Sequence, residues 1–208
     1  MSREARSRAR WRRSWDRQAA SYDRTMSFLD RVLFKDSREW VCTQAQGHTL
    51  EVAIGTGLNI PAYSGEVTLS GVDLSPAMLK VAQDRAFQQG REVVLQLSDA
   101  EQLPFADATF DAVVCTFSLC GIPEPATAVA EMSRVLKPGG LLLLADHVAA
   151  ANLAVRGVQR LLELVTVPLE GEHFLGRPSQ LVREAGFHIE AVQRFNLGIV
   201  ERLAARKP

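Results

Sequence analysis

Apolar runs alternate with helix-forming stretches through the middle of the chain. Five runs read as strands, each of them short and rich in β-branched or aliphatic residues. Pro76 and Pro125 each open a stretch of helix formers, and Gly90 and the sequence Lys137-Pro138-Gly139-Gly140 end them. Alternation of this kind predicts an α/β fold with a mostly parallel sheet and helices on both faces. The five runs are Thr49–Ile54, Ser70–Asp73, Val93–Leu97, Phe110–Cys115 and Leu141–His147.

The two ends of the chain follow other patterns. Residues 1–43 read as an arginine-rich tail followed by helices. After residue 148 we expect a helix, a loop and two strands, at 187–192 and 199–205. The connection between these last strands is too short for a helical crossover, so they are predicted to pair antiparallel.

A tight glycine turn, Gly55-Thr56-Gly57, follows the first predicted strand. Glycine lets a ligand come close to bare backbone, so this turn indicates a cofactor site. Asp73 ends the second predicted strand, 22 residues after Glu51. An acid at that end of a parallel sheet can accept hydrogen bonds from both hydroxyls of a ribose. Ile60 stands where a dinucleotide fingerprint has its third glycine, which favours a nucleoside without pyrophosphate over NAD or FAD.

The order of these motifs, with Ser98-Asp99-Ala100, Leu103-Pro104-Phe105 and Arg134 to Gly140 following, resembles the class I S-adenosylmethionine-dependent methyltransferases over about residues 49–147. Within them the chain is most similar to enzymes with small or lipophilic acceptors: phosphatidylethanolamine N-methyltransferases, ubiquinone/menaquinone C-methyltransferases and thiol methyltransferase-like proteins. The resemblance implies a Rossmann-like seven-stranded sheet with one reversed strand. It also implies S-adenosylmethionine (SAM) as cofactor, a lid formed by residues 1–43 and a core formed by residues 44–208 in a single domain. Asn59 departs from the commoner glycine-rich form of the motif.

The resemblance also assigns roles to residues. Glu51 is expected near the methionine end of the cofactor, Asp73 at the ribose and Asp99 at the adenine amine. Tyr22, with Trp15, matches a segment that covers the cofactor. His147 ends the fifth predicted strand and is the candidate catalytic residue, able to orient or deprotonate an acceptor. The expected cofactor contacts are Tyr22, Glu51, Gly55, Gly57, Asp73, Leu74, Met78, Asp99, Ala100 and Thr116.

Structural alternatives stand beside these roles. Asp73 could cap the helix that opens at Pro76, Met78 could belong to the core, and His147 could make a structural hydrogen bond. Methyl transfer from a sulfonium requires no metal, and the Glu/His cluster at residues 170–174 lacks a complete ligand set, so no metal is expected.

Length, charge and cysteine spacing limit the kinds of protein that this chain could be. The 208 residues suit one domain, and the formal net charge is zero, which argues against a general polyanion-binding surface. Cys42, Cys115 and Cys120 lack zinc or disulfide spacing and are expected to be buried thiols. No run is apolar enough to span a bilayer and no secretory signal opens the chain, so we expect a cytoplasmic protein.

Residues 1–40 carry eleven Lys and Arg against six Asp and Glu, interleaved with aromatic and aliphatic residues. Such a segment could be a lid helix with a solvated face or an amphipathic element on an anionic membrane. We expect a small-molecule or lipid acceptor with a nitrogen, sulfur, oxygen or carbon nucleophile. Two alternatives stay open: a nucleic-acid methyltransferase and a non-catalytic cofactor-binding protein. Against the first, residues 115–120 show no (D/N)PP(Y/F) base-methylation motif.

Overall fold

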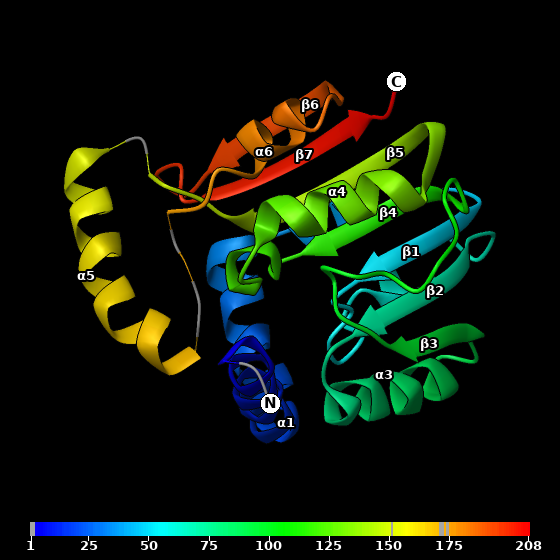
Figure 1. The fold of residues 1–208 in the computed structure, drawn as a ribbon, viewed down its shortest axis with the longest axis horizontal. Helices are drawn as coiled ribbons and strands as arrows, with labels where there is room; N and C mark the ends of the chain where they lie inside the picture. Colours follow the sequence, from blue (N-terminus) through cyan, green and yellow to red (C-terminus); the bar gives the residue numbers. More distant parts are fainter. Residues whose placement is uncertain (1–2, 151, 171–172, 174) are drawn as a thin grey trace.

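The computed structural model describes residues 3–150, 152–170, 173 and 175–208. Its centre is a seven-stranded sheet in the order β3-β2-β1-β4-β5-β7-β6 (Figure 1). The strands are β1 His48–Val52, β2 Thr68–Asp73, β3 Val93–Leu97, β4 Phe110–Thr116, β5 Leu136–His147, β6 His188–Phe195 and β7 Val200–Arg206.

Strand β7 is the one that runs against the others. It pairs antiparallel with both β5 and β6, while the pairs among β1 to β5 are all parallel. The predicted sheet with a single reversed strand is therefore confirmed, as is the antiparallel pairing of the two C-terminal strands. A turn through Asn196 and Gly198 joins β6 to β7, too short to hold a helix.

Helices cover both faces of the sheet, as predicted. One buried cluster joins Val113 and Cys115 of β4 to Met132 of α4 and Val182 of α6. The other joins the alternate β4 residues Ala112 and Val114 to Val41 of α2 and Ala86 of α3. Alternate side chains of β4 therefore pack into two hydrophobic clusters, one on each face of the sheet. The helices are α1 Arg3–Leu29, α2 Ser37–Cys42, α3 Pro76–Gln88, α4 Pro125–Val135, α5 Leu153–Glu170 and α6 Pro178–Glu184, with shorter turns η1 Asp30–Phe34, η2 Ile60–Ala62 and η3 Leu119–Gly121.

The start of α3 decides one alternative for Asp73. The hydroxyl of Ser75 accepts a hydrogen bond from the Met78 amide at 3.1 Å, and Pro76 occupies the first turn. Ser75 is therefore the residue that caps α3. Asp73 lies two residues before Ser75, at the end of β2, and its side chain is not the cap of α3.

Two sequence-based expectations for local structure were wrong. The turn predicted at 137–140 lies inside β5, where pairing with β4 shifts from Phe110–Leu136 to Ala112–Leu141. Gly139 absorbs the extra residues with a left-handed φ of 72°. The arginine-rich tail is helical from Arg3 onward, because the stretch is rich in helix-forming Arg and Ala and docks on α3.

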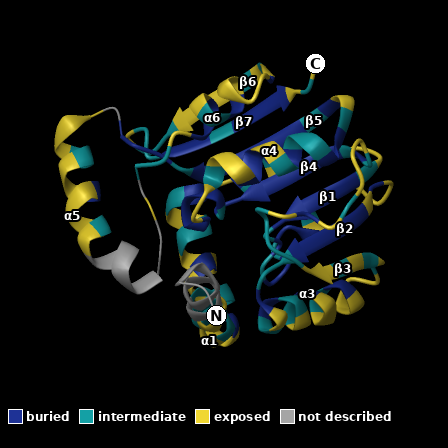
Figure 2. Cartoon of the chain, viewed as in Figure 1, coloured by how far each residue is buried: buried dark blue, intermediate teal, exposed yellow. Residues whose placement is uncertain are grey.

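Helix α1 turns much of its apolar side toward the rest of the protein. Ala19 and Met26 are buried, as is Phe34 of η1, whereas Phe28 and Val32 are exposed. Figure 2 shows that the described part of α1 carries both exposed and less exposed residues. Among the described residues, no helix has both the length and the apolar character needed to cross a bilayer.

Candidate active site

A cavity of about 730 Å³, counting the open space at its mouth, lies at the carboxyl ends of β1 and β2. Parallel strands end at the same edge of the sheet, which brings together residues far apart in the sequence. Seven of the ten predicted cofactor contacts line it: Tyr22, Gly55, Asp73, Leu74, Met78, Asp99 and Ala100. The other lining residues are Trp11, Trp15, Ala53, Val72, Ser98, Phe117, Ser118, Cys120, Gly121 and Ile122.

The two glycines of the turn after β1 have different tasks. Gly55 adopts a left-handed φ of 58°, and a Cβ built there would meet nothing within 4 Å, so its backbone is open to a ligand. Gly57 does not line the cavity. A Cβ at Gly57 would stand 2.6 Å from Cδ1 of Ile60 and 3.2 Å from Cα of Ala82. Gly57 therefore serves close packing of the turn against α3, and its role as a direct cofactor contact stays a prediction.

Asp73 is held in place by backbone donors. Its Oδ2 accepts from the Gly55 amide at 2.9 Å and its Oδ1 from the Ser75 amide at 2.8 Å. Burial raises the pKa of Asp73 to about 6 despite these hydrogen bonds. A carboxylate has about four acceptor positions, so these donors leave acceptor capacity for a hydroxyl in the cavity.

The lining of the cavity also includes a second acid and an apolar surface. Asp99 follows β3, and its Oδ1 accepts from the Glu101 amide at 3.0 Å. Met78 is buried and Leu74 half-buried, and both border the cavity. An apolar slot with carboxylates at two separated points is able to hold a flat base and a sugar at the same time.

Helix α1 lies across this cavity and is pinned to both cofactor turns. Asp16 accepts from the Ser75 hydroxyl at 2.6 Å, at the start of α3. Asp23 accepts from the Thr56 hydroxyl at 2.6 Å, in the glycine turn, and is also bonded to Arg85. Between these two acids the helix presents aromatic rings to the cavity, from Trp15 and Tyr22 together with Trp11. The placement suits the predicted lid, and closure itself stays a prediction.

We expect loss of the Asp16 contact to loosen α1 and weaken cofactor binding. Asp16→Ala should raise the cofactor Kd by about 5–30-fold, because one charge-assisted hydrogen bond of roughly 1–2 kcal/mol is lost. Calorimetry measures this, and Asp84→Ala on the exposed side of α3 is the control. An unchanged Kd for Asp16→Ala would show that α1 does not help retain the cofactor.

Two predicted contacts, Glu51 and Thr116, are buried and do not line the cavity. Glu51 accepts from Asn59 Nδ2 and from the Tyr63 hydroxyl, both at 2.8 Å. Thr116 accepts from the same Asn59 amide at 2.8 Å and from Arg38 at 3.2 Å. The network ties β1, β4 and the glycine turn together, and direct cofactor contact by Glu51 or Thr116 stays a prediction.

Glu51 should make stability depend on pH. Burial raises its pKa to about 7 from an ordinary 4.5, so the folded state disfavours the ionised form. Stability contributed by this residue is therefore lost as pH rises from about 4.5 through 7. From pH 5 to pH 8 wild type should lose roughly 2–3 kcal/mol of unfolding free energy relative to Glu51→Gln. Urea unfolding at both pH values tests this, and a pH-independent difference would contradict it.

Sequence reasoning missed Arg38. Its guanidinium donates to Asp30 at 3.0 Å and to Asn59 at 3.1 Å, and lies 5.0 Å from the ring centre of Phe117. Its Nη2 is buried without a hydrogen-bond partner within the described residues. Nothing in the sequence separates Arg38 from the other arginines of the basic segment, because its partners come from three distant elements.

A second cavity, of about 540 Å³, adjoins the first. Cys120 and Ile122 border both cavities. The predicted catalytic residue, His147, lines the second cavity and not the first. The remaining residues of its lining are Leu119, Pro123, Pro125, His173, Gly176, Arg177, Pro178 and Leu181.

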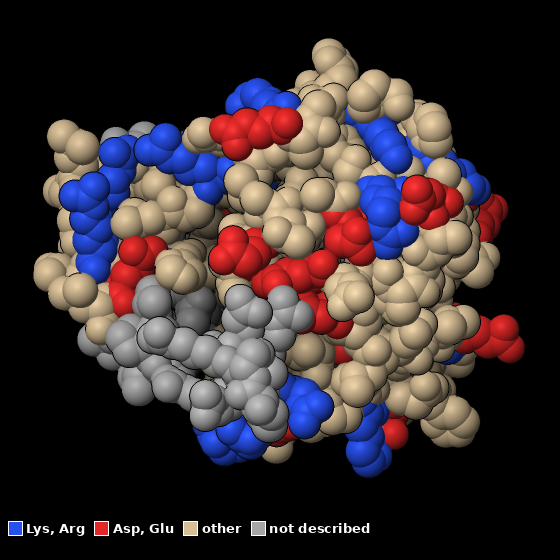
Figure 3. All heavy atoms as spheres, viewed as in Figure 1, with Lys and Arg blue, Asp and Glu red and all other residues tan. Residues whose placement is uncertain are grey.

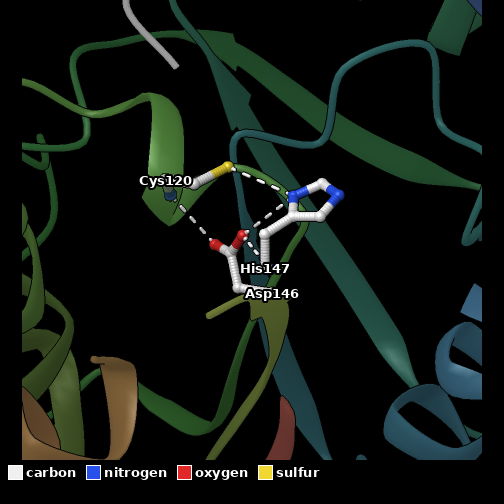
Figure 4. A group of neighbouring side chains, drawn as sticks. All are labelled: Cys120, Asp146 and His147. Carbon is white, nitrogen blue, oxygen red and sulfur yellow. Dashed lines mark hydrogen bonds and ion pairs between the residues drawn. The ribbon is translucent and has the colours of Figure 1, made fainter. Parts of the chain in front are cut away.

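His147 is oriented by two neighbours (Figure 4). Its Nδ1 lies 3.7 Å from Oδ1 of Asp146 and 3.7 Å from Sγ of Cys120, and its ring packs edge-on against Phe34. Asp146 is buried and accepts backbone hydrogen bonds from Cys120 at 3.0 Å and from His147 itself at 2.7 Å. A buried carboxylate beside Nδ1 can fix the orientation of the imidazole ring.

Cysteine and histidine placement completes the site. The three cysteines are free and buried, as predicted. Cys120, Asp146 and His147 offer ligand atoms that all lie within 4.8 Å of one another. Within the described residues, these three side chains form the group that could hold a metal ion. Of the predicted Glu/His cluster, Gly171, Glu172 and Phe174 lie outside the described residues.

Known proteins with related sequences are methyltransferases. The family model described as "Methyltransferase domain" matches residues 50–144. Phosphatidylethanolamine N-methyltransferase of Cereibacter sphaeroides is 40% identical over 56% of this chain and 58% of its own length, so the chain spans little more than half of that relative. Demethylmenaquinone methyltransferase of Lactiplantibacillus plantarum is 29% identical over 88% of this chain and 90% of its own length.

The deciding relative is thiol S-methyltransferase TMT1B of Rattus norvegicus, 33% identical over 84% of this chain and 70% of its own length. The chain belongs to the class I SAM-dependent methyltransferases. A SAM-dependent methyltransferase from Methanosarcina mazei has the same fold, with a TM-score of 0.64, 22% identity, and 80% of this chain and 94% of that one aligned. The resemblance read from the motifs is confirmed.

The first cavity of this methyltransferase fits SAM, the cofactor of the family. Gly55 offers open backbone, Asp73 keeps acceptor capacity beside it, and Asp99 lines the same cavity together with apolar residues. The residues that would hold the ribose and the adenine are thus Asp73 and Asp99, with Met78 and Leu74 against the base. Aromatic rings from α1 would exclude water from the sulfonium end.

Proposed function

We propose that the protein transfers the sulfonium methyl group of SAM to a small apolar or amphiphilic molecule bound in the second cavity. The observation that carries this proposal is the wall shared by the two cavities. Cys120 and Ile122 border both, so a donor in one and an acceptor in the other are neighbours. Holding two reactants at near-attack distance supplies roughly 7–11 kcal/mol of the barrier.

The lining of the second cavity supports this class of acceptor. Most of it is apolar, from Leu119, Pro123, Pro125 and Leu181. Its ionisable groups are cysteine, histidine and arginine, with no acid among the described lining residues. An apolar body with one polar or anionic group therefore matches this surface better than a cation does.

The chain's own residues have four tasks in the reaction. When bound, SAM supplies an already activated methyl group. Asp73 and the Gly55 turn hold the nucleoside, and α1 excludes water. His147 accepts the proton of an oxygen or sulfur nucleophile, and Asp146 stabilises the resulting imidazolium at Nδ1. Cys120 and Ile122 fix the separation of donor and acceptor.

The alternatives predict different behaviour. A nucleic-acid methyltransferase would use the arginines of α1 on phosphates, with strongly salt-dependent binding. Two acids of that helix, Asp16 and Asp23, are bonded to the cofactor turns, so its inner side faces the protein. A non-catalytic binder would hold SAM without turnover.

Two further expectations stay proposals. The basic segment 1–40 could touch a membrane peripherally, and Phe28 and Val32 are its exposed apolar residues, 66% and 57% accessible. A cytoplasmic location is also still a prediction. Neither is needed for methyl transfer.

An acceptor panel tests the proposed function. Purified protein is incubated with methyl-labelled SAM and separate thiols, phenols, quinols, amines and phospholipids. The proposal expects label in one class, with one S-adenosylhomocysteine released per methyl group. Label in RNA or DNA would favour the first alternative. SAM binding without label transfer to any acceptor would favour the second.

A further inference from the structure

Helix α5 turns its apolar side to solvent. Leu153, Leu161 and Leu164 follow helical spacing along one side and are 77%, 66% and 72% accessible. Val158 lies beside them at 57%. The side facing the protein carries polar groups instead, with Gln159 buried and Glu163 half-buried. This is the reverse of a helix that packs on a core.

Polar hydrogen bonds hold α5 to the protein. Gln159 accepts from the Ala150 amide and donates to the Val148 carbonyl, both at 2.8 Å. Glu163 accepts from the Leu175 amide at 2.9 Å. The bonds run to the chain segments on either side of the helix, and Figure 1 shows α5 standing apart from the sheet. The apolar side is thus left uncovered by the described part of the chain.

The charges beside this apolar side are positive. Arg160 is exposed on α5 and has no carboxylate partner among the described residues, whereas Arg156 donates inward to the Ala150 carbonyl at 2.9 and 2.7 Å. Between residues 152 and 164 the one acid is Glu163, which faces inward. Figure 3 shows basic side chains gathered over the end of the molecule that α5 forms.

Charge distinguishes the candidate occupants of this surface. A second copy of the chain, meeting α5 with its own α5, would bring arginines against arginines with no acid to pair them. An anionic lipid surface complements both features, because acyl chains accept the leucines and headgroups accept the guanidinium groups.

We propose that α5 is an interfacial helix that docks the protein on an anionic lipid surface. Leu153, Leu161 and Leu164 enter the boundary between headgroups and acyl chains, and Arg160 lies at the phosphates. Gly176, Arg177 and Pro178, which follow α5, also line the second cavity, so docking brings that cavity close to the lipid. The inference does not depend on methyl transfer.

Vesicle sedimentation with the full chain tests this inference. The vesicles are phosphatidylcholine alone or phosphatidylcholine mixed with phosphatidylglycerol. Wild type should bind the mixed vesicles, less tightly as salt rises. The double variant Leu161→Asp, Leu164→Asp should bind at least about tenfold more weakly, and Arg160→Gln about fivefold. The control Phe87→Asp alters an 84% accessible side chain on α3 and should bind as wild type does.

Folding is checked by thermal unfolding of each variant, since the substituted leucines are solvent-exposed. Three results would overturn the inference. One is no binding of wild type to mixed vesicles. Another is equal loss in Phe87→Asp and the α5 variant. The third is a dimer in sedimentation equilibrium that the α5 variant dissociates, which would make a second copy the occupant.

Discussion

Replacing His147 with alanine should lower turnover of an alcohol or phenol acceptor by about 10²–10⁴-fold and leave SAM affinity unchanged. His147 borders the second cavity and not the first, so its loss removes a proton acceptor and spares the cofactor site. The expected loss is mild for a thiol that ionises near neutral pH, because that nucleophile needs less help.

Steady-state kinetics of wild type and His147→Ala from pH 6 to pH 9 measure this effect. Asp146→Asn is the matched variant, since it leaves the imidazole but removes the carboxylate 3.7 Å from Nδ1. It should shift the pH profile of turnover more than it changes KM. Parallel profiles with equal rates for His147→Ala and wild type would remove His147 from the mechanism and leave positioning alone.

Asp73→Ala should weaken SAM binding by about 5–150-fold, which corresponds to roughly 1–3 kcal/mol of charge-assisted hydrogen bonding. The pKa of Asp73 is raised to about 6, so its carboxylate is charged above that pH. Wild-type affinity should therefore fall as pH drops from 7 through 6, while the affinity of Asp73→Ala should show less of this dependence. Calorimetry at both pH values measures both effects.

The control is Asp84→Ala, which removes an exposed acid of α3 and so measures any general effect of losing an acidic side chain. An Asp73→Ala protein that stays folded and binds SAM as wild type does would show that the ribose site lies elsewhere.

Much of the fold could be predicted because local chemistry and tertiary structure agree. Pro76 and Pro125 open α3 and α4 as their fixed φ angles require. Strand ends marked by Gly55, Asp73 and Asp99 meet at one edge, because parallel strands leave the sheet on the same side. Each helix start and each strand end is marked by residues close in sequence, and the parallel topology then brings the strand ends together.

The missed features depend on residues far apart. Asp16 and Asp23 look like surface acids of a basic helix, yet they bond to turns 59 and 33 positions away. Glu51 has two partners that the strand motif does not reveal, because Asn59 and Tyr63 lie 8 and 12 positions further along the chain. The spacing of apolar residues predicts an apolar side on α5, but it does not predict whether that side faces the core or solvent.

The most direct test of this account is a calorimetric titration of the unmodified chain with S-adenosylhomocysteine, the expected product. The account predicts binding of one molecule per chain, weakened by Asp73→Ala and by Asp16→Ala but not by Asp84→Ala. A folded protein that takes up no ligand, or that binds equally in all these variants, would contradict the assignment of the cavity at β1 and β2 as the cofactor site.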